Sequence, residues 1–123
     1  MQTFIQLFRP SFPKMLKMIA TDPATGIDFA SLKSGGIIMQ RDDDFFAIRL
    51  KLIGGSISVM QLRRIADIVE KHGRGEVRLT ARQGIEIPWI LFEDIESVRK
   101  ELAEDGLVLG PCGPRFRTVT ACP

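Results

Sequence analysis

Long apolar runs, net charge and cysteine are all scarce in this chain of 123 residues. No apolar run approaches the roughly 20 residues that a helix needs to span a bilayer. The opening MQTFIQLFRPSFPK lacks the basic residues that begin a signal peptide. A net charge of +2 excludes the large basic field of a non-specific nucleic-acid binder. These absences predict a cytoplasmic protein with neither membrane nor nucleic acid as a partner.

The two cysteines, Cys112 and Cys122, both stand near the end of the chain. Two thiolates cannot complete a four-thiolate zinc site or iron–sulfur cluster. A disulfide between them is disfavoured in a reducing compartment. The chain stops on TACP, with no terminal helix or polar tail. We therefore expect it to be a fragment of a longer protein.

Hydrophobic residues make up 45% of the chain and charged residues 26%, which suits one soluble domain with a modest core. Prolines and glycines interrupt residues 1–44 and predict an irregular N-terminal extension, with short helices near 13–20 and 28–33. Asp42-Asp43-Asp44 is expected to form a solvated turn. Apolar residues near the start are candidates for packing on a second copy of the chain or on a missing domain: Phe4, Ile5, Leu7 and Phe8.

A regular pattern begins at residue 45. FFAIRLKL, residues 45–52, alternates apolar and polar positions, as in a half-buried strand, and Gly54-Gly55 ends it. Ser58 followed by Gln61 has the spacing of a capping box and predicts a helix over 58–72. Gly73 is expected to close that helix in a left-handed conformation. The apolar face of the helix is expected to consist of Leu62, Ile65, Ala66 and Val69.

The stretch EVRLTARQGIEIP, residues 76–88, alternates again, with a turn at Gln83-Gly84. We predict strands over 76–82 and 85–90, a helix over 92–105 closed by Gly106, and a last strand over 107–109. The apolar stripe of this helix is expected to consist of Ile95, Val98 and Leu102.

This order predicts an α+β fold, a ferredoxin-like β-α-β-β-α-β half-domain over 45–110. Right-handed crossovers put both helices on one face of a four-stranded antiparallel sheet. Residues 111–123 are then a connector into a missing domain.

The other face of this sheet is predicted to be cationic. The side chains expected there, on what we take to be the two central strands, are Arg49, Lys51, Arg78, Thr80 and Arg82. Almost no carboxylate is expected among them, and like charges on neighbouring strands repel. An anionic partner would remove that repulsion, and the planar guanidinium suits oxyanions. A merely solvated face is the alternative.

Two segments of the chain resemble a known family of enzymes. HGRGEVRLTARQGIEI, residues 72–87, together with RTVTACP, residues 117–123, resembles the sirohaem-dependent sulfite and nitrite reductases. The similarity covers residues 34–123 and is closest to small anaerobic and dissimilatory-type sulfite reductases. It implies an oxidoreductase with sirohaem and a [4Fe–4S] cluster, acting on sulfite or nitrite and served by an electron-donor protein.

The resemblance also implies roles for single residues. Arg82 and Arg117 would bind the substrate oxyanion, and Cys122 would be the first cysteine of a C-x5-C pair on the cluster. The residues that would contact sirohaem carboxylates are Arg49, Arg78, Thr80 and Gln83.

Under this resemblance the remaining cysteines and the catalytic lysines would lie in a C-terminal cluster domain beyond residue 123. The chain alone is therefore expected to be inactive, without a cluster or tightly bound sirohaem. Cys112 has no family role and is expected to be a small buried residue.

A second class of function stays open: a regulatory or structural module that binds a small ligand without redox activity. RNA recognition is disfavoured, because it needs aromatic rings on the central strands. His72, in the last turn of the first long helix, is expected to cap that helix rather than bind a ligand. Trp89 is expected in the core or against a partner.

Overall fold

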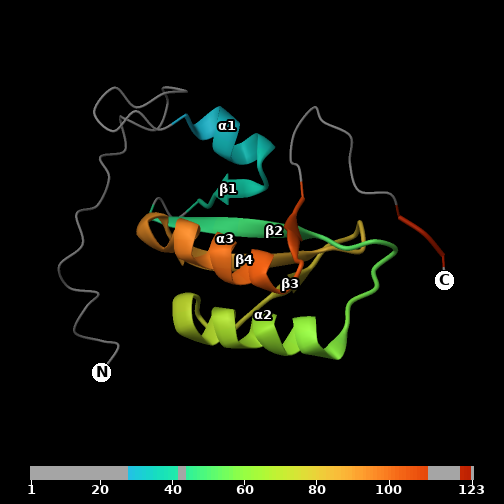
Figure 1. Cartoon of the computed structure of the whole chain (residues 1–123). Helices are drawn as coiled ribbons and strands as arrows, with labels where there is room; N and C mark the ends of the chain where they lie inside the picture. The colour runs from blue at the N-terminus through green and yellow to red at the C-terminus, as the bar shows by residue number, and fades with distance from the viewer. Residues whose placement is uncertain (1–27, 42–43, 111–119, 123) are drawn as a thin grey trace.

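The structure is a computed structural model, and it describes residues 28–41, 44–110 and 120–122 (Figure 1). Its elements are α1 (Phe29–Ser34), β1 (Ile37–Met39), β2 (Phe45–Lys51), α2 (Val59–His72), β3 (Arg78–Leu79), β4 (Ile85–Leu91), the 3-10 turn η3 (Phe92–Asp94), α3 (Ile95–Glu104) and β5 (Val108–Leu109). The order from β2 to β5 confirms the predicted ferredoxin-like half-domain. None of the helices in these ranges is long and apolar enough to cross a membrane.

The sheet has five strands rather than the predicted four. Its order is β1-β2-β4-β3, and β5 also pairs with β2. Both β1 and β5 are antiparallel to β2 and share one edge of it, since Ile37 lies opposite Ile48 and Leu109 opposite Leu50. The added strand β1 comes from residues whose glycines predict irregular structure.

The predicted strand 76–82 differs most from the structure. Only Arg78 and Leu79 are extended, and β3 pairs with β4 alone, so it is an edge strand and the prediction of a central position is wrong. The physical reason is a tight turn. The Gln83 amide donates to the Thr80 carbonyl at 3.1 Å, and the Thr80 amide donates to the Gly84 carbonyl at 2.9 Å. This turn takes residues 80–84 out of the strand and pairs β3 with β4, and β4 lies between β3 and β2.

Helix α2 starts as its sequence predicts but ends differently. The Ser58 hydroxyl accepts from the Gln61 amide at 3.1 Å, and the Gln61 side chain accepts from the Ser58 amide at 3.2 Å, which completes the capping box. Gly73 ends the helix with φ −105°, so its predicted left-handed conformation is wrong. Gly75 has φ +76° instead, two residues later.

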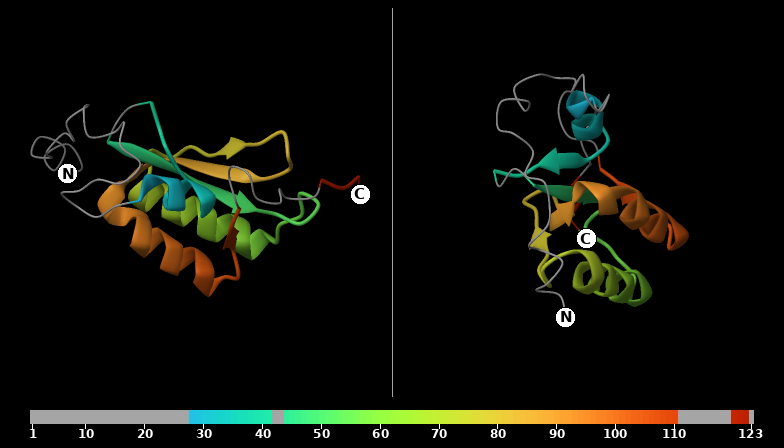
Figure 2. Two further views of the ribbon diagram at one scale, coloured as in Figure 1. Left: turned by 90° about the horizontal axis from the view of Figure 1, so that it is seen from above. Right: turned by 90° about the vertical axis from the view of Figure 1, so that its left-hand side faces the viewer.

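Both long helices cover the same face of the sheet (Figure 2). In α3 the buried residues are the predicted Ile95, Val98 and Leu102. In α2 the buried residues are Ile65, Ile68 and Val69, whereas Leu62 and Ala66 are exposed, so the buried stripe is shifted around the helix from the predicted one. These residues pack on the strand residues Ile48, Leu50, Ile85, Ile87 and Ile90 to form the core.

A β-bulge interrupts β4 at Trp89. Phe46 pairs with Ile90, but Ile48 pairs with Ile87, so β4 holds one residue more than β2 between these pairs. Trp89 has φ +65°, an uncommon conformation for a residue with a bulky side chain. Because strand residues alternate between faces, this extra residue lets Ile87 and Ile90 both face the core. It leaves Trp89 at the opposite face.

Candidate functional site: the open face of the sheet

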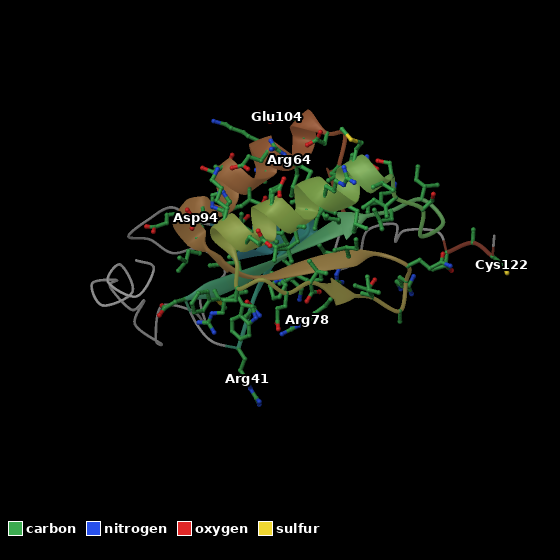
Figure 3. The ribbon with its side chains drawn as sticks, turned by 90° about the horizontal axis from the view of Figure 1, so that it is seen from below. Arg41, Arg64, Arg78, Asp94, Glu104 and Cys122 are labelled. Carbon is green, nitrogen blue, oxygen red and sulfur yellow. The ribbon has the colours of Figure 1, made fainter. Side chains whose placement is uncertain are left out.

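We call the side of the sheet opposite α2 and α3 the open face. Arg49 on β2, Glu86 on β4 and Arg78 on β3 lie side by side there, since both arginines are register partners of Glu86. Arg49 donates to Glu86 at 2.8 Å, and Arg78 lies 3.9 Å from the other oxygen of Glu86. Figure 3 shows Arg78 directed away from the helices. Two of the four predicted cations, Arg49 and Arg78, thus lie side by side on this face.

The expected scarcity of carboxylates on this face is wrong. Glu86 occupies its centre, and Glu76 lies 3.6 Å from Arg78. The Glu86 side chain is only 14% exposed and that of Arg49 36%, so the pair is partly shielded from water. Repulsion between the arginines is therefore relieved within the chain. The alternation Ile85-Glu86-Ile87 carries the signal that would have placed Glu86 on the open face.

A hollow of about 700 Å³ lies on this face near β1. Its lining is partly apolar and partly cationic: Ile38, Met39, Gln40, Arg41, Ala47, Arg49, Arg78, Glu86 and Trp89. Figure 3 shows Arg41 and Arg78 leaving the sheet on the same side. The Gln40 side chain accepts from the Trp89 amide at 2.8 Å and so satisfies the bulge. A lining that combines apolar side chains with guanidinium groups suits a flat ligand that carries carboxylates.

Aromatic rings also reach this region. The Arg74 guanidinium lies 4.4 Å from the ring centre of Trp89 and 4.5 Å from that of Phe45. The Trp89 indole donates to Glu76 at 2.7 Å. These contacts hold the indole in place through cation–π attraction and a hydrogen bond. An alternation pattern alone cannot place Trp89 here. The signal that could have done so is Pro88, because proline inside a central strand is typical of a bulge.

The cations at the other end of the open face have fewer contacts with other side chains. Arg82 lies exposed in the turn after β3, and Lys51 is exposed at the end of β2. Within the described ranges, neither side chain forms an ion pair or a hydrogen bond. Thr80 has a structural part, because its hydroxyl oxygen accepts from the Gly84 amide at 3.0 Å. The predicted set of five polar residues is thus divided between strands and turn.

Gln83 does not point into the hollow. Its side-chain amide donates to the Ala121 carbonyl at 2.7 Å and accepts from the Ala121 amide at 2.9 Å. Cys122 follows, exposed and with a free thiol. Arg117 and Cys112 lie outside the described residues, so their roles stay predictions. Among the residues that the structure does describe, no group of three or more His, Cys, Asp or Glu could hold a metal ion.

His72 belongs to the helices, far from this face. Its Nε2 lies 3.0 Å from Glu101 on α3, and its Nδ1 lies 3.7 Å from Asp94. Lys71 donates to the same Glu101 oxygen at 2.7 Å. Hydrogen bonds from Lys71 and then His72 lower the pKa of Glu101, against the opposing effect of burial. This network ties α2 to α3, so the structure gives His72 a structural place at the helix end.

Comparison with known proteins agrees with this architecture. The family described as "Nitrite/Sulfite reductase ferredoxin-like half domain" matches residues 38–105. This chain belongs to that family. The match runs from β1 through the end of α3, so it includes both central strands of the open face.

Relatives place this half-domain inside much longer proteins. An uncharacterized protein of Methanocaldococcus jannaschii is 40% identical over 87 residues, which cover 71% of this chain and 30% of that protein. The coenzyme F420-dependent sulfite reductase of the same organism is 33% identical over 89 residues, covering 72% of this chain and 14% of the reductase. The half-domain chain thus spans less than a third of either relative.

A solved structure supports the fold. The NirA protein of Mycobacterium tuberculosis superposes with a TM-score of 0.67 at 21% sequence identity, over 89% of this chain and 24% of that one. At this identity the likeness concerns the fold of the half-domain alone.

Proposed function

We propose that the open face of this half-domain holds the carboxylates of sirohaem and the substrate oxyanion in a sulfite or nitrite reductase. One observation carries the proposal: Arg49, which pairs with Glu86 at 2.8 Å, and Arg78, 3.9 Å from the same carboxylate, line a hollow together with apolar residues. Membership of the nitrite/sulfite reductase half-domain family supports it.

The residues of the hollow fit such a ligand. Sirohaem is a flat macrocycle rimmed with carboxylates, and guanidinium groups of Arg41, Arg49 and Arg78 line the hollow beside apolar Ile38 and Ala47. Glu86 adds little repulsion, since both of its oxygens face guanidinium groups. When bound, sirohaem supplies the iron that coordinates the substrate and passes electrons to it.

The contacts within the chain suggest a division of roles. Arg49 is already oriented by its 2.8 Å contact with Glu86, which suits a group that anchors a resident cofactor. Arg78 lies 3.9 Å from the same carboxylate and has the same proposed role. The Thr80 hydroxyl accepts from Gly84 and keeps its own proton to donate to a carboxylate. The Gln83 side chain is paired with Ala121 and does not point into the hollow, so we leave it out of the proposed sirohaem contacts. Arg82 has no ion pair within the described ranges, which suits a group that binds and releases an oxyanion; Arg117 has the same proposed role.

Cys122 is the proposed cluster ligand of this chain. It is exposed, and one thiolate is a quarter of what a [4Fe–4S] cluster needs, so three ligands would come from elsewhere. A partner domain and an electron donor would complete the enzyme. The chain alone should reduce neither sulfite nor nitrite.

A titration of the chain with sirohaem, followed by absorption, tests the face. We expect weak binding at low salt that disappears as salt rises, because exposed charges separated by about 10 Å are screened at 0.1 M. Arg49→Ala and Arg78→Ala should weaken this binding. Arg99→Ala is the matched control, since Arg99 pairs with Glu96 on α3, away from the open face.

Two outcomes would contradict the proposal. Absence of any sirohaem binding at low salt, with binding of another small anion intact, would favour the ligand-binding module instead. Equal weakening by Arg99→Ala would mean that binding follows net charge rather than the open face.

Turnover tests the substrate role in a protein that completes the site. Arg82→Ala and Arg117→Ala should leave haem content intact and lower kcat/KM by about ten- to a hundredfold, the worth of a charge-assisted hydrogen bond. Arg49→Ala should lower haem content itself. Unchanged turnover of the Arg82 and Arg117 variants at full haem occupancy would remove the substrate assignment.

A further inference from the structure

The side-chain amide of Gln83 pairs with Ala121 as two peptide groups pair across a sheet. Its Nε2 donates to the Ala121 carbonyl at 2.7 Å, and its Oε1 accepts from the Ala121 amide at 2.9 Å. A primary amide carries a donor and an acceptor in one plane, so it can satisfy both backbone groups of one residue. The two bonds join residues that are 38 positions apart in the chain.

The backbone of Gln83 makes this side chain notable. Gln83 has φ +57°, the left-handed region in which glycine is the easier residue. The hydrogen bonds of the turn between Thr80 and Gly84 hold it there. The backbone alone would therefore favour glycine at this position. The pairing with Ala121 gives a physical reason for an amide side chain.

The glycine turn after β2 lies against this pair. Gly54 and Gly55 have φ +59° and +70°. A Cβ on Gly55 would lie 3.1 Å from the Cβ of Gln83, and one on Gly54 would lie 3.6 Å from the Cβ of Ala121. Three segments thus meet at one tip of the molecule, next to Cys122, which Figure 3 shows well away from Arg41.

We propose that Gln83 is a positioning residue for Cys122. By pairing with the preceding residue, Gln83 fixes the backbone from which the thiol projects, beside the turn that carries Arg82. The positioning itself needs no cofactor. Its consequence for a cluster rests on the proposed function, in which Cys122 is a cluster ligand.

A nitroxide on Cys122, in a chain with Cys112→Ser, measures this positioning through its mobility in the electron paramagnetic resonance spectrum. Gln83→Gly suits the positive φ and removes only the amide. The variant should keep the wild-type unfolding midpoint, release the nitroxide, and raise amide exchange at Ala121 by about tenfold or more.

In Gln83→Glu, low pH should restore the pairing with Ala121. A neutral carboxyl group offers both a donor and an acceptor, whereas a carboxylate offers acceptors alone. The nitroxide should therefore be held at low pH and released as that carboxyl group ionises, between about pH 4 and 7. Gln61→Ala is the matched control: its amide also bonds to backbone, at the Asp105 carbonyl, 3.0 Å away, and should leave the nitroxide unchanged.

An equally immobile nitroxide in Gln83→Gly would overturn the inference. Sirohaem titration separates this role from a cofactor contact, because a positioning residue should leave sirohaem affinity unchanged and a contact should not. If the nitroxide is released in Gln83→Gly but Cys122→Ser in a completed enzyme keeps its cluster, the proposed function fails for Cys122 and the positioning stands.

Discussion

The two faces of the sheet share the same central strands and differ in almost everything else. Toward α2 and α3, the strands present aliphatic residues that are fully buried, such as Ile48 and Ile87. Toward the open face, they present Arg49 and Glu86, held by an ion pair. Burial of apolar area stabilises a domain far more than exposed ion pairs do. One face can therefore carry the stability while the other keeps charged groups available for a ligand.

The largest expected effect comes from the covered face. Leu102→Ala removes a side chain that is fully buried between α3 and the sheet, and should lower the free energy of unfolding by about 2–5 kcal/mol. Leu79→Ala is the matched change on β3, where the residue is 81% exposed, and should stay within about 0.5 kcal/mol. Urea unfolding of both variants measures this contrast. A comparable loss in Leu79→Ala would show that the edge strand is covered.

Glu86→Ala should have an intermediate effect. It leaves Arg49 and Arg78 facing each other across β4 and should lower the free energy of unfolding by about 1 kcal/mol. Sulfate should recover part of this loss by taking the place of the carboxylate. Glu96→Ala, at an exposed pair with Arg99, is the control and should change little. Thermal unfolding with and without sulfate tests this, and an absent sulfate response would argue against an anion site.

Acid should weaken the tie between the helices by a smaller amount. The folded pKa of Glu101 lies below its ordinary value of 4.5, so its ionised form is favoured in the folded chain. This contribution is complete above the unfolded pKa and is lost as pH falls through the folded one. Wild type should therefore lose more stability than Glu101→Gln on acidification below about pH 5. Parallel stability curves for the two proteins would exclude this contribution.

The smallest effect is expected for Arg82→Ala. Because Arg82 is exposed and has no ion pair within the described ranges, its removal should change the free energy of unfolding by less than about 0.5 kcal/mol. Arg49→Ala should lower the free energy of unfolding more. It leaves Glu86 largely shielded from water, and the remaining cation, Arg78, lies 3.9 Å from it. Equal losses in the two variants would mean that Arg82 has a structural partner.

Sequence patterns predicted much of the covered face because burial imposes a regular period, although the buried stripe of α2 is shifted from the predicted one. The stripe of Ile95, Val98 and Leu102 and the capping box at Ser58 follow from local rules and are confirmed. The open face was harder, because its residues depend on the order of the strands. The charges were visible in the sequence, but the pairing of Arg49 with Glu86 depends on β4, not β3, being the neighbour of β2. The pairing of Gln83 with Ala121 is a tertiary feature that no short pattern predicts, whereas Pro88 inside β4 is a local signal for the bulge at Trp89.

The shared edge of β2 has a further consequence for the domain as a unit. β5 and β1 run in the same direction along that edge, and the end of β5 lies next to the start of β1. Both ends are bonded to Arg49: the Gly110 amide donates to the Arg49 carbonyl, and the Arg49 amide donates to the Gly36 carbonyl. A side chain on Gly36 would collide with the Gly110 carbonyl. The segments that enter and leave the sheet are thus neighbours, as circular permutation and insertion into a host chain require. In a circular permutant that joins Gly110 to Gly36 and opens the chain elsewhere, β5 and β1 would form one continuous edge strand.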